Sequence, residues 1–304
     1  MQPMSDDELG NAVGQGFFQI DRTEGANGFD FTRFTFGMDV DVSLNADLIE
    51  FGRYPRAGET APSDIRINDF ALGSVENGVI NPFKIKDPFF ELAFERNSQG
   101  GQDLVGVRVG FGEALGKLSG NIESLTGNLE VDVIGTARPI YDVASTGQKL
   151  LLGIAGVTRN TVLSTDAVLQ DENGNRDEIR AQWVGVQNGV PLNCDSGCNL
   201  GSLTDGLLSL FKSDNCQILG IQTCFRLNTF RTLDIQKADG SPATGMFLSL
   251  QTKTVSWVDD NGRINTPAAQ GAFLNIPNGG IKVDFEQSFN GTRRVQTKFV
   301  DPYY

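Results

Sequence analysis

Strict alternation of apolar and polar residues marks the chain from position 34 to position 48. The even positions are apolar, from Phe34 to Leu48, and the odd positions between them are polar, acidic or glycine. This period of two predicts a β-strand with its even residues buried on one face and its odd residues in water. Because most strands are much shorter, we expect either one long strand or a strand bent by a bulge at Gly37.

Further strands are predicted on both sides of the middle of the chain. The runs 89–94 and 104–111 flank a polar turn at 97–101 and predict an antiparallel hairpin. Ser-Gly-Asn-Ile and Thr-Gly-Asn-Leu follow each other within 119–129 and suggest turns of a meander or short coils of a solenoid. The strand-like runs near the end of the chain are 247–250, 255–258 and 281–285.

Two segments have the features of short helices. Ser5 and Glu8 form a capping box ahead of a short apolar stripe, and Gly14 can end that helix. The second segment, 202–212, has leucines at helical spacing and lies between the cysteines.

These patterns predict a mainly β protein, either an antiparallel β-sandwich or an elongated, barrel-like sheet with long strands and one or two short helices. The predicted parts are an N-terminal arm over 1–20, a β-rich domain over 21–160 and a second β-rich region over 161–304. The second region carries the helix flanked by cysteines, and the two β-rich parts are equally compatible with one continuous domain.

Composition narrows the classes of function. The formal net charge is −13, so the chain is repelled by nucleic acid and we expect no nucleic-acid partner. The chain has no histidine, which removes the commonest general base and metal ligand, and we expect a protein that is not an enzyme and has no cofactor. No run approaches the roughly 20 apolar residues of a membrane helix, and no signal peptide is visible. We therefore expect no membrane span and, for a secreted protein, a signal peptide already removed.

All four cysteines lie within one short region, which points to local disulfide bonds. Four cysteines allow three pairings, and a zinc site is the alternative, although the spacing is not that of paired C-x-x-C motifs. We favour two local disulfides in an oxidising compartment. The predicted pairs are Cys194–Cys198 and Cys216–Cys224.

Alternate oxygen-bearing side chains between 171 and 177 resemble a calcium-binding loop. Arg176 stands where such a loop has glycine, and Gln182 stands where it has glutamate, so an Asn-Gly hairpin turn explains the segment equally well. The candidate calcium ligands are Asp171, Asn173, Asn175 and Asp177.

The beginning of the chain, PMSDDELGNAVGQGFFQID, resembles the mature N-terminus of secreted proteobacterial surface proteins of the Fil-type pilus or filament system. The segments 87–95, 106–131 and 216–227 are also similar to that group. The resemblance implies a secreted, non-enzymatic protein at the surface of a Gram-negative bacterium, possessing no catalytic residues and forming part of a fibre. The opening is similar to bacteriocin leader peptides as well, from which it departs at Gln15.

The sequence therefore favours an extracellular structural protein, a subunit of a cell-surface filament that assembles with copies of itself and with other surface components. Phe17, Phe18 and Ile20 are the candidate assembly residues, either as an arm that adds a strand to a neighbouring subunit or as the first strand of the chain's own sheet. The alternatives are a secreted adhesin that binds glycan or calcium, an outer-membrane β-barrel and a carboxylate glycosidase.

Overall fold

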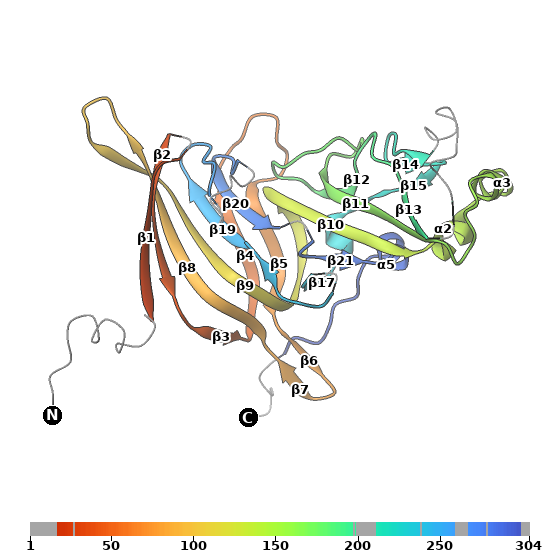
Figure 1. Ribbon diagram of the computed structural model, residues 1–304, viewed down its shortest axis with the longest axis horizontal. Helices are drawn as coiled ribbons and strands as arrows, with labels where there is room; N and C mark the ends of the chain where they lie inside the picture. The colour runs from red at the N-terminus through yellow and green to blue at the C-terminus, as the bar shows by residue number, and fades with distance from the viewer. Residues whose placement is uncertain are drawn as a thin grey trace, which may run out of the picture.

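The computed structural model describes residues 17–26, 28–196, 198, 211–237, 239–258, 267–277 and 279–298 (Figure 1). Strands dominate these residues, and most of their pairings are antiparallel. The predicted mainly β fold class is therefore confirmed. The helix predicted at 5–13 and most of the one predicted at 202–212 lie outside the described residues.

The elements have the following bounds in chain order. The strands are β1 (Phe18–Ala26), β2 (Phe29–Phe36), β3 (Asp39–Val42), β4 (Leu44–Arg53), β5 (Ser63–Leu72), β6 (Ser74–Glu76), β7 (Val79–Asn81), β8 (Phe83–Arg96), β9 (Gln102–Leu125), β10 (Gly127–Thr136), β11 (Val162–Gln170), β12 (Trp183–Val186), β13 (Asn193–Ser196), β14 (Gln217–Ile218), β15 (Ile221–Gln222), β16 (Cys224–Arg226), β17 (Thr232–Ile235), β18 (Ala243–Thr244), β19 (Phe247–Gln251), β20 (Gly271–Ile276) and β21 (Lys282–Val283). The helical elements are α2 (Arg138–Val143), α3 (Thr146–Ile154), the 3₁₀ turn η3 (Leu227–Thr229) and α5 (Phe285–Asn290).

The hairpin of β8 and β9 is the centre of the main sheet, and it confirms the hairpin predicted around 97–101. β9 is 24 residues long and takes part in two regions of the sheet. Its first half pairs with β8 and β19, and its second half pairs with β5 and β17. Beyond β8 the sheet continues through β2 to β1, which is an edge strand among the described residues.

The other side of the sheet extends away from β1. β20 pairs antiparallel with β19 and parallel with β10, and β10 continues through β11 and β12 to β16. The sheet thus joins strands from before and after residue 160. Figure 1 places helices α2 and α3 at one end of the longest axis of the molecule and β1 toward the other.

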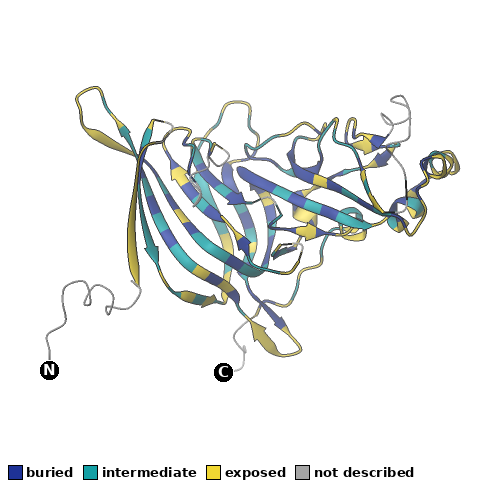
Figure 2. Cartoon of the chain, in the orientation of Figure 1, coloured by how far each residue is buried: buried dark blue, intermediate teal, exposed yellow. Residues whose placement is uncertain are grey.

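Buried side chains form two apolar clusters. The larger cluster contains Phe83, Leu118 and Leu169 and lies among β5, β8, β9, β10 and β11. The smaller cluster contains Phe31 and Trp257 and lies against β2, β9 and β19. Figure 2 shows buried and partly exposed positions alternating along the long strands, as the pleat of a β-strand requires.

The alternating region 34–48 forms three strands, β2, β3 and β4, so the prediction of one strand with a single buried face is wrong. Phe34 of β2 lies opposite Phe90 of β8, whereas Val40 of β3 lies opposite Ile85 of β8. The pairing of β3 with β8 is therefore shifted by one residue relative to the pairing of β2 with β8. Because adjacent residues of β8 point to opposite faces, the even side chains change face between β2 and β3. The irregularity lies at the position where the sequence predicted a bend.

The even side chains of β3, Val40 and Val42, lie half-buried against the larger core cluster, and Ser43 is exposed. Val42→Asp is expected to lower the free energy of unfolding by about 2 kcal/mol, because a charge would replace an apolar side chain packed on the core. Ser43→Asp is the matched control and is expected to change it by less than about 0.5 kcal/mol. Chemical denaturation measures both, and equal losses would contradict this placement of Val42.

The two Gly-Asn sequences are not turns, contrary to prediction. Gly120 lies within β9, and Gly127 begins β10. A Cβ atom at Gly120 would overlap the Ile67 side chain, and one at Gly127 would overlap the carbonyl oxygen of Leu274. Glycine is required at these positions because other parts of the chain approach the backbone closely.

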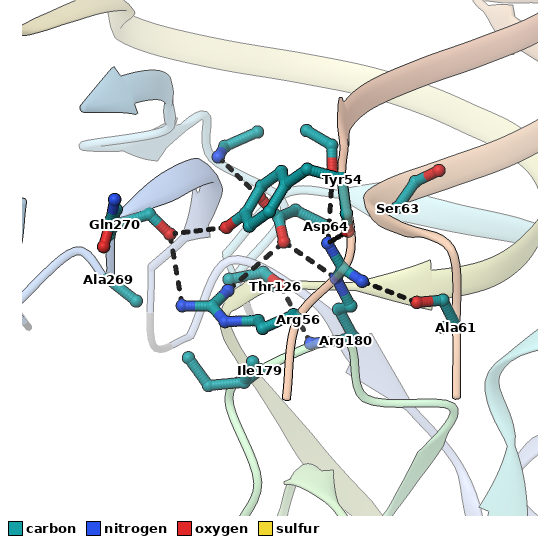
Figure 3. Close-up of polar contacts among 12 residues, drawn as sticks. Tyr54, Arg56, Ala61, Ser63, Asp64, Thr126, Ile179, Arg180, Ala269 and Gln270 are labelled. Carbon is teal, nitrogen blue, oxygen red and sulfur yellow. Dashed lines mark hydrogen bonds and ion pairs between the residues drawn. The ribbon is translucent and has the colours of Figure 1, made fainter. Parts of the chain in front are cut away.

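A buried ionic network fixes the start of β5 (Figure 3). The fully buried Asp64 carboxylate accepts hydrogen bonds from Arg180 Nε at 2.9 Å, Arg56 Nη1 at 3.2 Å and the Ala272 backbone N–H at 3.0 Å. Arg180 is itself buried and donates to the backbone carbonyl oxygens of Gly52, Tyr54 and Ala61. The network therefore connects β5, the loop after β4, the loop before β12 and β20.

Both predicted disulfide bonds are present, Cys194–Cys198 and Cys216–Cys224. The second joins the start of the β14–β15 hairpin to β16, and both of its cysteines are buried. The first links Cys194, which lies in β13 and is partly exposed, to Cys198.

Candidate assembly surface

The edge strand β1 carries the candidate assembly residues. Phe18 aligns with Phe36 of β2, and Ile20 aligns with Phe34. The sequence was compatible with two arrangements of these residues, an arm that adds a strand to a neighbouring subunit or the first strand of the chain's own sheet. In the structure, Phe18 and Ile20 belong to β1, which is the first strand of the chain's own sheet. Among the described residues β1 pairs with β2 alone, so the backbone of its second edge faces away from the sheet.

One side of the sheet formed by β1, β2, β8, β9 and β19 is apolar, and we call it the outer face. Phe34 stacks on Phe90 of β8 with ring centroids 4.5 Å apart. Phe90 in turn aligns with Val109 of β9, which aligns with Leu248 of β19. The outer face is made of Phe18, Ile20, Phe34, Phe36, Phe90, Val109, Leu248 and Leu250.

Many of these side chains remain in contact with water. Phe18, Ile20, Val109 and Leu250 each have between 45% and 52% of their surface exposed, and Phe17 beside them has 64%. The aromatic rings of β1, β2 and β8 contact one another across the strands. A contiguous apolar surface of this kind is typical of an interaction site, whereas single exposed apolar residues are common on any protein.

Charged residues border the outer face toward β3. Asp39 and Asp41 align with Lys86 and Lys84 of β8. Lys86 Nζ also lies 3.7 Å from a carboxylate oxygen of Glu113 in β9. An apolar centre with a charged margin is the usual organisation of a protein–protein interface.

A carboxylate at the other end of β2 holds the edge hairpin in place. Asp30 accepts hydrogen bonds from Arg96 Nε at 2.9 Å and from the Gly25 backbone N–H at 2.8 Å. Gln102 at the start of β9 donates to the same carboxylate. The hydrogen bonds from Arg96 and then Gly25 hold the pKa of Asp30 below its ordinary value, so the carboxylate stays charged and connects the β1–β2 hairpin to β8 and β9.

The opposite side of β1, β2 and β8 carries a polar groove of about 520 Å³. Glu91, at the groove, is buried and forms ion pairs with Arg108 and with Arg33, the latter at 3.4 Å. The Arg108 guanidinium lies 5.0 Å from the ring centroids of Phe247 and Trp257. Other residues that line the groove are Gln19, Asp21, Thr23, Thr35 and Asp87.

The candidate calcium ligands form hydrogen bonds within their own loop. Asp171 Oδ1 accepts from the backbone N–H groups of Asn173 and Asn175, each at 2.9 Å, and Asp177 accepts from Ile179. Burial alone would raise the pKa of Asp171, but the hydrogen bonds from Asn175 and Asn173 lower it below the ordinary value. These contacts are those of a tight turn, the alternative that the sequence allowed, and the calcium site stays a prediction.

Sequence reasoning found the β1 part of the outer face but missed the parts from β8, β9 and β19. One sequence signal of the β8 part was present in residues 89–94, where apolar residues occupy both odd and even positions and therefore both faces of the strand. Phe89 and Ala93 are buried on the inner side, so the outer side of β8 is apolar without being needed for the core. A strand that is apolar on both faces indicates that each face packs against another part of the protein or against a partner.

Comparison with protein-family models, with curated proteins and with solved structures gave no match. In the part of the chain that the structure describes, no helix has the length and apolar character needed to cross a membrane. The same described residues contain no group of three or more histidine, cysteine, aspartate or glutamate side chains placed to hold a metal ion.

Proposed function

We propose that the protein is an extracellular structural protein, a subunit of a cell-surface filament or pilus-like fibre, and that it acts without catalysing a reaction. The observation that carries this proposal is the outer face, which extends across five strands and ends at the open edge of β1. Two disulfide bonds support an oxidising, extracellular compartment, because cytosolic reductants keep most thiols reduced.

The edge of β1 supports subunit contacts in a second way. An edge strand has backbone N–H and C=O groups that another chain can pair with, and monomeric proteins usually protect such edges. Strand addition by a neighbouring subunit would extend the sheet and continue its apolar face at the same time. Both contributions come from residues 18–26, so one region of the subunit supplies backbone pairing and side-chain burial.

The polar groove supports a second candidate, a secreted adhesin that binds a neutral glycan. Its lining combines carboxylates, hydroxyls and an amide with the ring of Phe89, and such a mixture suits hydrogen bonding to sugar hydroxyls and packing on a sugar ring. The groove and the outer face lie on opposite sides of the same strands, so the two functions are compatible in one subunit.

The double variant Phe18→Ser with Val109→Ser tests the assembly proposal. Both side chains are about half exposed, so the changes remove apolar surface from the outer face without opening a cavity in the core. Sedimentation velocity is expected to find concentration-dependent oligomers for the wild-type chain and monomers for this variant at the same concentrations.

The double variant Val79→Ser with Ile80→Ser is the matched control. These two exposed side chains lie on the small β6–β7 hairpin, away from the outer face, and the control is expected to associate as the wild type does. If the outer-face variant and the control sediment alike, the proposed role of the outer face is wrong.

A further inference from the structure

The end of the molecule opposite β1 carries a second exposed apolar surface, on helices α2 and α3. Val143, Leu150 and Ile154 have 58%, 67% and 56% of their surface exposed. Leu150 and Ile154 are four residues apart and therefore lie on the same side of α3. Among the described residues no element covers this side of the helix (Figure 2).

The α2–α3 segment is held firmly enough to serve as a docking element. Ser145 and Gln148 form a reciprocal capping box at the start of α3. Gln148 also donates through Nε2 to the carbonyl oxygen of Leu219 in the β14–β15 hairpin, and Leu152 is fully buried. The helix is thus anchored by its inner side, while Leu150 and Ile154 on its other side face water.

The two ends of the molecule differ in charge. Residues 137–160 carry three basic side chains, Arg138, Lys149 and Arg159, and a single acidic one, Asp142. Residues 17–53, which form β1 to β4, carry seven acidic and three basic side chains. In a chain with a net charge of −13, the α2–α3 end is therefore a basic exception, and the net negative charge of another copy attracts it.

We propose that the α2–α3 segment of one subunit docks on the outer face of the next, with Leu150 and Ile154 against the apolar side chains that lie between Phe18 and Val109. This inference rests on the proposed function and supplies the second half of its interface. A contact between two different surfaces is heterologous, and repeating it gives an open chain of subunits unless the rotation closes a ring. Figure 1 places α3 and β1 toward opposite ends of the longest axis, which suits a linear chain.

A complementation experiment tests this pairing. The helix variant Leu150→Gln with Ile154→Gln retains good helix formers at exposed positions, and circular dichroism and thermal melting verify its fold. The outer-face variant is Phe18→Ser with Val109→Ser. Each variant alone is expected to sediment as a monomer, because it lacks one half of the contact. An equimolar mixture is expected to form a species of twice the subunit mass and nothing larger.

Other outcomes overturn the pairing in distinguishable ways. If the helix variant associates as the wild type does while the outer-face variant stays monomeric, the outer face pairs with itself; the inference is then wrong and the proposed function stands. If the mixture gives no complex although both variants are folded, the inference is equally wrong. If the wild-type chain is monomeric at every concentration, the proposed function fails, and the inference fails with it.

Discussion

Asp64→Ala is expected to lower the free energy of unfolding by about 3–5 kcal/mol, because it removes the acceptor for two arginines. Arg180 is 3% exposed, and its guanidinium would be left in the interior with backbone carbonyl oxygens and the Tyr54 ring as partners but no carboxylate. Breaking a buried ion pair costs more than the pair contributes, since the remaining charge is left without compensation. Denaturation by urea, monitored by fluorescence or circular dichroism, measures the loss.

Asp142→Ala provides the comparison for an exposed ion pair. Asp142 Oδ1 lies 2.8 Å from Arg159 Nη2, about the same distance as in the Asp64–Arg180 pair, but both side chains are more than half exposed. Exposed pairs contribute about 0–1 kcal/mol because water and salt screen them, so this variant is expected to lose less than about 1 kcal/mol. If both variants lose the same small amount, the Asp64 network does not hold β5 in place.

The same network affects Tyr54, whose hydroxyl donates to the Gln270 carbonyl oxygen at 3.4 Å. Burial, and then the negative charge of Asp64, raise the pKa of Tyr54 above its ordinary value. The tyrosine therefore stays neutral, and its ring lies 4.8 Å from the Arg180 guanidinium. Arg180 thus has aromatic as well as carboxylate and carbonyl partners in this interior site.

Gly127→Ala is expected to lower the free energy of unfolding by about 3 kcal/mol. The new methyl group would overlap the carbonyl oxygen of Leu274, and both strands are fixed there by the parallel pairing of β10 with β20. A backbone atom cannot rotate away as a side chain can, so β10 and β20 must separate. Thermal and chemical denaturation measure the loss.

Gly147→Ala is the matched control, because a Cβ atom at Gly147 in α3 would meet nothing within 4 Å. Alanine favours the helix relative to glycine by about 0.5–1 kcal/mol, so this variant is expected to be as stable as the wild type or slightly more stable. A Gly127→Ala variant as stable as the control would contradict the close approach of β10 and β20.

The local features of the fold could be predicted from sequence because they depend on neighbouring residues. The β8–β9 hairpin follows from alternation on both sides of a polar turn, and the two disulfides follow from cysteines close together in the chain. The change of face between β2 and β3 could not be predicted, since it is set by register against β8, about 50 residues later.

Long-range contacts explain the other differences. Gly120 and Gly127 resemble turn residues in the sequence. Glycine is needed there because Ile67 and Leu274, both distant in sequence, approach the backbone too closely for a Cβ atom. Asp64 and Arg180 are 116 residues apart, and neither stands in a motif. Of the outer face, the sequence predicts only Phe18 and Ile20 as assembly residues, because a single strand does not tell which strands will continue its apolar side.

Electron microscopy of the oxidised wild-type chain over a rising series of concentrations tests the proposed assembly most directly. Assembly through the outer face predicts elongated particles that lengthen as the concentration rises. Single subunits at every concentration would contradict it.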